Sequence, residues 1–141
     1  MKNRFNIYST TADIGLKVLG GSLDEIFVNA ALGYYSILNI SREDSSQSEK
    51  IIALKAKERE TLLIDMLNEL IYIYETEGFI GENASAELHC PKQYILHMHL
   101  KGYLCSMENE NPDVLVKAAT YSNLTVKEMQ DHWQANIIFD I

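Results

Sequence analysis

The sequence predicts one α+β domain, a sandwich of largely antiparallel sheet with two helices. The chain has 141 residues, a length typical of a single domain, so residues 1–141 are expected to share one core. Two long segments repeat apolar residues at helical spacing, and much of the rest repeats them at every second position. Strand-like runs around two well-separated helices favour helices packed on one face of antiparallel sheet.

Two short strands are predicted at the start of the chain. Residues 5–7 and 14–18 alternate apolar side chains with polar or small ones. The polar stretch 9–13 interrupts this pattern, and Gly20-Gly21 ends the second strand. The polar break therefore lies between two segments that are expected to be buried.

The first helix is expected from Ser22 to about Leu38. Ser22 and Glu25 form a capping box, in which the two side chains bond free amide groups at the helix start. Apolar side chains then recur every three or four residues, so one face of the helix should meet the core. The polar residues 41–50 follow, and they predict an exposed loop.

A further strand and the second helix come next. Residues 52–56 alternate like a strand with one solvent-facing side. From about Glu60 to Glu77 the apolar residues keep a 3.6-residue stripe, and Gly78 supplies the stop. The stripe consists of Leu62, Leu63, Met66, Leu67, Leu70, Ile71 and Tyr74.

Four strands are predicted after Phe79, where the period of two returns. They are expected at residues 94–101, at 114–119, from 124 onward and at 133–139. Turn-forming residues separate them at 108–113, 122–123 and 130–132, and the last of these should close a hairpin.

Composition excludes several classes of protein. Hydrophobic residues make up 47% and charged residues 23%, which is close to average globular usage and unlike a disordered or fibrous chain. The formal net charge of -8 opposes contact with phosphate backbones, so no direct nucleic-acid partner is expected. No apolar run reaches the length of about 18 residues that a membrane helix needs. With no signal-like N-terminus either, we expect a cytoplasmic protein whose two cysteines are free thiols.

Catalytic signatures are missing, and two aspartates stand out instead. The sequence has no phosphate-binding glycine loop, nucleophile elbow, or zinc motif of the His-Glu-x-x-His or Cys-x-x-Cys kind. Asp13 lies in the polar gap between strands, and Asp140 lies in a terminal apolar strand beside the carboxylate of Ile141. Such oxygen ligands suit Ca²⁺ or Mg²⁺. Spacing alone favours a simpler interpretation, in which Asp13 caps a turn and Asp140 is solvated.

Other candidate residues have simpler interpretations. His97 and His99 share one face of a strand, which is compatible with a metal pair but more typical of a solvated face. Lys117 lies in an apolar run and must reach solvent or find an anion. A polar side of the second helix is expected to be solvated, with partner docking as the alternative; it consists of Asp65, Asn68, Glu69 and Tyr72.

Four short strings together resemble the archease family. The first string is Thr11-Ala12-Asp13-Ile14-Gly15, and the second begins at Leu62. The third is Lys117-Ala118-Ala119-Thr120-Tyr121, and the fourth is the terminal Ile138-Phe139-Asp140-Ile141. The second string reads Leu-Leu-Ile-Asp-Met-Leu-Asn-Glu-Leu, and a Ser-Leu-Asp-Glu helix start lies between the first two. Their order, the total length and the C-terminal end all match, so the resemblance covers essentially the whole chain.

The resemblance implies a fold and a role. Archeases have an α+β fold with two helices and assist the tRNA-splicing ligase, which joins a 3′-phosphate or 2′,3′-cyclic phosphate RNA end to a 5′-hydroxyl end. They promote guanylylation of a ligase histidine, support multiple turnover and bind a divalent cation, typically Ca²⁺. Carried over by position, the metal ligands would be Asp13, Asp140 and the Ile141 terminus. The family commonly has histidine where this chain has Thr10 and Ser122, so two imidazoles are lost.

The sequence therefore predicts a non-catalytic, cation-binding activator of an RNA ligase. Its acidic end would engage the metal- and nucleotide-binding cleft of the ligase, and Glu69 and Lys117 could orient that end. Two alternatives remain open at this point. One is a stand-alone metal-dependent phosphoesterase that uses the same acidic site. The other is a general chaperone-like binding module.

Overall fold

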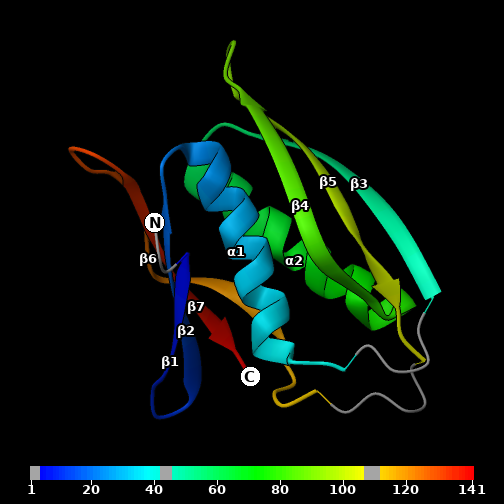
Figure 1. Cartoon of the computed structure of the whole chain (residues 1–141). Helices are drawn as coiled ribbons and strands as arrows, with labels where there is room; N and C mark the ends of the chain where they lie inside the picture. The colour runs from blue at the N-terminus through cyan, green and yellow to red at the C-terminus, as the bar shows by residue number, and fades with distance from the viewer. Residues whose placement is uncertain (1–3, 42–45, 107–111) are drawn as a thin grey trace.

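The computed structural model describes residues 4–41, 46–106 and 112–141 of the chain. It confirms the α+β class and the two predicted helices (Figure 1). The elements in chain order are β1 (Phe5–Ser9), β2 (Asp13–Gly20), α1 (Leu23–Leu38), β3 (Ser46–Ala56), α2 (Arg59–Glu77), β4 (Phe79–His89), β5 (Tyr94–Leu104), β6 (Ala118–Glu128) and β7 (Trp133–Asp140).

The strands form two separate antiparallel sheets. One sheet has four strands in the order β1-β2-β7-β6, and the other has three in the order β3-β5-β4. Helix α1 packs against β2 of the first sheet and β4 of the second, while α2 packs against β6 and β3. The helices therefore contact both sheets and lie between them (Figure 1), an arrangement that the sequence pattern did not specify.

Helix α1 begins as the capping box predicts. The N-cap residue Ser22 is extended, and its hydroxyl accepts a hydrogen bond from the backbone N–H of Glu25 at 3.2 Å. Asn39 ends the helix in the left-handed conformation with φ 51°, and its N–H donates to the carbonyl of Tyr35. The buried face of α1 includes Ile26, Phe27, Ala30, Ala31, Tyr34 and Leu38.

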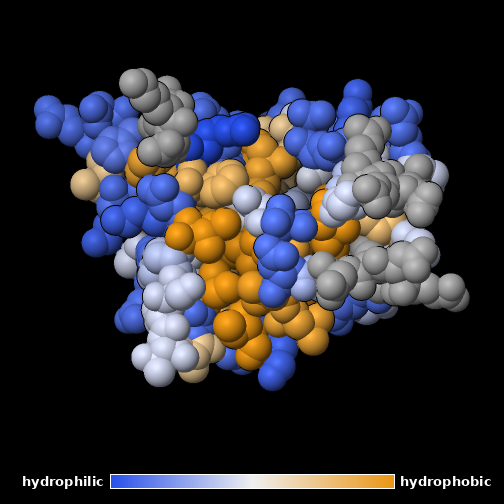
Figure 2. Space-filling view, turned by 60° about the horizontal axis from the view of Figure 1, so that its bottom comes forward, coloured by the Kyte–Doolittle hydropathy of each residue, from blue (hydrophilic) through white to orange (hydrophobic). Residues whose placement is uncertain are grey.

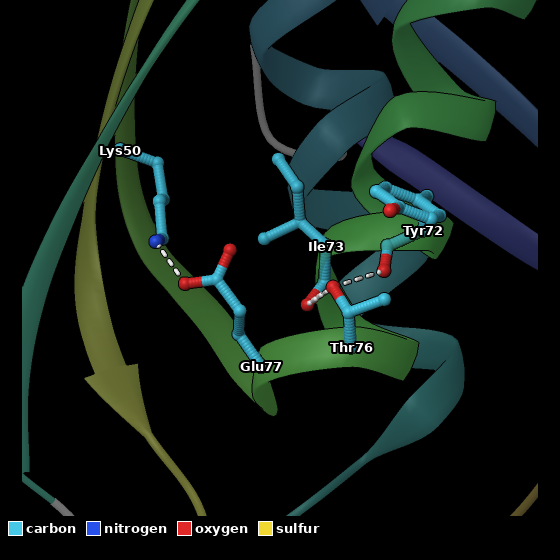
Figure 3. A network of polar contacts seen from close by, with 5 residues as sticks. All are labelled: Lys50, Tyr72, Ile73, Thr76 and Glu77. Atoms are coloured by element: carbon cyan, nitrogen blue, oxygen red, sulfur yellow. Dashed lines mark hydrogen bonds and ion pairs between the residues drawn. The ribbon is translucent and has the colours of Figure 1, made fainter.

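Helix α2 is fastened at its C-terminal end. Gly78 adopts φ 74°, which confirms the predicted stop. In the last turn the hydroxyl of Thr76 donates to the carbonyl of Tyr72 at 2.9 Å, and Lys50 of β3 forms an ion pair with Glu77 (Figure 3). The ion pair between Lys50 and Glu77 thus connects the C-terminal end of α2 to β3.

Four predictions about the strands and their turns were wrong in detail. Residues 46–50 were expected in a loop, but they begin β3, where an edge strand tolerates polar side chains. Residues 42–45 lie outside the described part of the chain. Strand β4 was not predicted, because its inward residues after Gly81 are mostly alanines, which give a weak alternation. Residues 114–117 precede β6 instead of forming a strand. Strand β6 spans the turn expected at 122–123, where Asn123 has φ 51° and the pairing with β7 shifts register between Thr120 and Thr125.

Other expectations are confirmed. Leu96, Met98 and Leu100 of β5 face the core, whereas the opposite face carries the two histidines. A hydrogen bond from the N–H of Met129 to the carbonyl of His132 closes the β6–β7 hairpin. Both cysteines are free thiols. Among the described residues, no helix is long and apolar enough to cross a membrane.

Candidate functional site

Folding brings Asp13 and Asp140 together. They are register partners on the neighbouring antiparallel strands β2 and β7. Residues directly opposite in such a ladder point to the same face, with Cβ atoms about 4.5–5.5 Å apart. The next pair, Ile14 and Phe139, is buried in the core, so the two carboxylates lie on the outer face of the sheet. A residue near the start of the chain and one near its end thus form a single acidic pair.

A tight turn fixes the backbone of Asp13. The N–H of Thr10 donates to the carbonyl of Asp13 at 3.0 Å, and the N–H of Asp13 donates to the hydroxyl oxygen of Thr10 at 3.2 Å. Asp13 is the first residue of β2, whereas the sequence pattern predicted that it lies in the gap between strands. Thr10 serves here to hold the turn that places Asp13.

The main chain of Lys117 contacts the main chain of Asp140. Its N–H donates to the carbonyl of Asp140 at 2.8 Å, and the following residue, Ala118, is the register partner of Asp140 on β6. The prediction that Lys117 lies within a strand was wrong, because β6 starts one residue later. Its side chain is exposed and forms no ion pair with another described residue.

Asn68 is a positioning residue that sequence reasoning undervalued. Its side-chain amide donates to the carbonyl of Ala119 at 3.3 Å, and its carbonyl oxygen accepts from the N–H of Ala119 at 2.8 Å. Ala119 pairs with Phe139, the residue before Asp140, so Asn68 ties α2 to the acidic end of the sheet. The neighbouring Glu69 makes no hydrogen bond or ion pair with another described side chain, and its orienting role stays a prediction.

The acidic pair lacks a cationic partner within the described part of the chain. Like charges directly opposite in a ladder are destabilising, so a cation would relieve the repulsion between Asp13 and Asp140. The described residues contain no group of three His, Cys, Asp or Glu side chains that could hold a metal. The pair fits a hard divalent cation, which uses carboxylate, main-chain and water oxygens together. It does not form a closed protein cage.

The residues around the pair are partly apolar. Ile141, which follows Asp140, is 39% exposed, and its predicted role as a metal ligand stays a prediction. Leu115, two residues before Lys117, is 65% exposed. The C-terminus lies at the lower end of the molecule in Figure 1, and the face seen from that end carries a broad apolar area (Figure 2). A broad exposed apolar area is typical of a protein-docking region.

The histidines lie elsewhere in the fold. All four are described residues, and His89, His97 and His99 belong to the three-stranded sheet. His132 lies in the β6–β7 turn, at the opposite end of β7 from Asp140. The Nε2 atom of His99 contacts Oε2 of Glu49 at 3.1 Å, so this imidazole already has a carboxylate neighbour. Ser122 donates its N–H to the hydroxyl oxygen of Thr120 at 3.3 Å.

Comparison with known proteins identifies the family of this chain. The family model of the archease protein family matches residues 5–141, nearly the full length. The chain belongs to the archease family. The resemblance seen in the four short strings is thereby confirmed, and the first and last of these strings contain the two aspartates that the fold pairs.

Curated relatives and solved structures agree with this assignment. The archease of Methanosarcina barkeri is 27% identical over 93% of this chain and 91% of the relative, and that of Pyrococcus furiosus is 29% identical over 95% and 96%. The solution structure of Methanobacterium thermoautotrophicum protein 1598 has a TM-score of 0.82 at 23% identity and covers 98% and 99% of the two chains. A Thermotoga maritima archease, described as a possible chaperone, has a TM-score of 0.66 at 18% identity and full coverage of both chains.

Proposed function

We propose that this archease is a non-catalytic activator of the tRNA-splicing ligase. It would promote guanylylation of the ligase histidine and support multiple turnover when the ligase joins 3′-phosphate or cyclic phosphate RNA ends to 5′-hydroxyl ends. The pairing of Asp13 with Asp140 is the observation that carries the proposal, because it concentrates negative charge at one end of the fold. Membership of the archease family adds support.

A hard divalent cation, Ca²⁺ or Mg²⁺, suits the acidic pair. Asp13 and Asp140 would hold it, with Ile141 as the further ligand that the family resemblance implies. When bound, the cation supplies positive charge that offsets the two carboxylates. The chain itself places those carboxylates through the Thr10 turn and the Lys117 main-chain bond.

The acidic end is expected to act by positioning and electrostatics. The net charge of -8 favours contact with a basic protein surface over contact with an RNA backbone. At the metal- and nucleotide-binding cleft of the ligase, a fixed pair of carboxylates would hold the nucleotide phosphates and metals in the geometry for attack by the ligase histidine. Glu69 and Lys117 would orient this end against the ligase.

The arrangement of the histidines favours an activator over a metal-dependent phosphoesterase. Such an enzyme needs a base or nucleophile beside the metal. All four histidines of the chain are described, and each lies in the other sheet or at the far end of β7 from the acidic pair. Isolated archease should therefore show no turnover of generic phosphoesters with Mg²⁺, Mn²⁺ or Ca²⁺, and measured turnover would favour the enzyme.

The direct test is single-turnover guanylylation of a cognate ligase. Wild-type archease should accelerate this step, whereas Asp13→Asn and Asp140→Asn should each lose most of the acceleration. Asp131→Asn is the matched control, because Asp131 is an exposed aspartate at the other end of β7. It should stimulate like the wild type.

Two results would count against the activator role. A folded Asp13→Asn variant that stimulates as well as the wild type would reject the acidic pair as the acting group. Suppression of aggregation of several unrelated clients, without any effect on the ligase, would favour the general binding module instead. Circular dichroism and the fluorescence of Trp133 would establish folding of each variant.

A further inference from the structure

The four edge strands of the two sheets differ in how well they are protected. Natural edges are usually blunted by shortness, by charged side chains, by bulges or by cover from other elements. In the described part of the chain β1 has only 5 residues, and β4 and β6 each carry a register shift. Strand β3 instead pairs with β5 in unbroken register from Ser46 to Ala56. It is the one long, regular edge, and it borders the three-stranded sheet (Figure 1).

An isoleucine is exposed in the middle of this edge. Ile51 is 79% exposed, the highest value among the large apolar side chains of the described residues. Its neighbour on the same face, two residues on, is the small Ala53. A hollow lies beside Ala53 and is lined by Ala53, Leu54, Lys55 and Ile95. The edge therefore offers both an apolar projection and an apolar recess.

We propose that β3 pairs antiparallel with β3 of a second copy of this chain. The proposed two-fold axis passes through Ile52, so residues 48–56 of the two copies face one another. Ile51 then lies opposite Ala53 of the other copy, beside the hollow that can receive it. The two three-stranded sheets become one continuous sheet, and the edges that remain among the described strands are the short β1 and the bulged β4 and β6.

Charge complementarity supports a second copy as the occupant. In this register Glu49, whose Oε2 also contacts Nε2 of His99 at 3.1 Å in its own chain, lies directly opposite Lys55 of the other copy, and symmetry repeats the pair. The two residues are six positions apart on one strand, about 20 Å, so they cannot pair within a single chain. Lys50, which could otherwise repel a second strand, points toward α2 and is paired with Glu77 (Figure 3).

The test is the concentration dependence of mass by sedimentation. Between about 5 μM and about 1 mM, the wild type should rise from 16.1 kDa toward twice that value. Ile51→Lys should leave a monomer throughout. Leu115→Lys is the matched control, because it places the same charge on an apolar residue of similar exposure outside the edge, and it should associate like the wild type.

Charge reversal tests the register itself. Glu49→Lys and Lys55→Glu should each weaken association about three- to tenfold, and the double variant should recover it. Recovery requires contact between copies, since the two residues are too far apart within one chain. A wild type that stays monomeric at 1 mM would overturn the proposal. So would single variants that weaken association while the double variant does not recover it.

The association of two copies through β3 can be tested separately from the proposed ligase activation. Ile51, Glu49 and Lys55 belong to the three-stranded sheet, whereas Asp13 and Asp140 belong to the other. A monomeric Ile51→Lys variant can therefore be assayed for ligase guanylylation. Loss of association with unchanged stimulation would support both assignments, and loss of stimulation in Asp13→Asn would not bear on association.

Discussion

The two sheets carry their unusual residues on different kinds of strand, central in one sheet and at the edge in the other. The four-stranded sheet carries its acidic pair on β2 and β7, its two central strands, and its edges are short or bulged. The three-stranded sheet carries its exposed isoleucine on β3, an edge strand with a regular free side. A central strand is held by hydrogen bonds on both sides, whereas an edge strand leaves half of its backbone groups available.

This difference separates a region that positions side chains from a region that can associate with another molecule. Side chains on doubly paired strands are fixed by their neighbours, which suits a site that must present two carboxylates in one geometry. An unpaired edge suits contacts that form and dissociate with concentration. The acidic end should therefore be firmly fixed, whereas the β3 edge should respond to protein concentration.

The largest effect is expected from Phe139→Ala. Phe139 is fully buried, packs near Tyr34 with ring centroids 6.1 Å apart, and directly precedes Asp140. Its truncation should lower the free energy of unfolding by about 3–5 kcal/mol. Urea denaturation followed by circular dichroism measures this change. Leu115→Ala, on a residue that is 65% exposed, is the control and should stay within about 0.5 kcal/mol of the wild type.

Two glycines offer a comparison between the sheets. A Cβ atom on Gly102 of β5 would lie 1.8 Å from the backbone oxygen of Ile80, whereas one on Gly15 of β2 would lie 2.0 Å from the ring of Tyr8. Backbone cannot move aside as a side chain can. Gly102→Ala should therefore lower the free energy of unfolding by about 3 kcal/mol, the upper end of the range for overpacking, and Gly15→Ala by less.

A double variant distinguishes the two cases. The Tyr8 ring crosses Gly15 to donate its hydroxyl to Oδ1 of Asn136 at 2.7 Å. In a Tyr8→Ala background the clash at Gly15 disappears, so Gly15→Ala should have little further effect on urea stability. No side-chain truncation should rescue Gly102→Ala. Equal costs of Gly15→Ala with and without Tyr8 would show that the ring does not limit this site.

The helices could be predicted from sequence because several signals agree. Ser22 caps α1, Gly78 stops α2, and each helix repeats apolar residues at one spacing. Strand β4 was missed because alanines fill its inward positions, so hydrophobic contrast is small. The separation into two sheets depends on pairing between distant strands, such as β2 with β7, and local periodicity contains no information about it.

The candidate site was predictable as a set of residues but not as a geometry. Asp13 and Asp140 stood out because carboxylates in apolar strand surroundings need a partner. Their direct opposition is set by the β2–β7 register, which the sequence does not display. The role of Asn68 was missed because an amide on a polar helix face looks the same whether it meets water or the backbone of Ala119.

Asn68→Ala should have an intermediate effect. The variant removes both hydrogen bonds to Ala119 and leaves a half-buried backbone N–H without its partner. We expect a loss of about 2 kcal/mol in the free energy of unfolding, measured in urea. Ligase guanylylation should also fall, since β6 and the neighbouring Asp140 lose their attachment to α2. Asp65→Ala, one turn earlier on the same helix and exposed, should change neither quantity.

The smallest effect is expected at the acidic pair, and its sign is informative. In the presence of a chelator, Asp13→Asn should raise the free energy of unfolding by up to about 1 kcal/mol, because it removes repulsion between opposed carboxylates. Added Ca²⁺ should stabilise the wild type with increasing concentration but leave Asp13→Asn nearly unchanged. Thermal unfolding with and without Ca²⁺ measures both changes.

Asp131, in the turn between β6 and β7, provides the opposite case. A hydrogen bond from His132 lowers the pKa of the Asp131 carboxyl, with attraction to that imidazole as the second cause. The charge of Asp131 is therefore favourable, and its contribution is lost as the pH falls below the ordinary aspartate pKa of about 3.9 and through the lowered folded-state value. Asp131→Asn should slightly destabilise the fold near neutral pH and should not alter the response to Ca²⁺. If Asp13→Asn lowered the free energy of unfolding in the presence of a chelator, as Asp131→Asn should, repulsion at the acidic pair would be refuted.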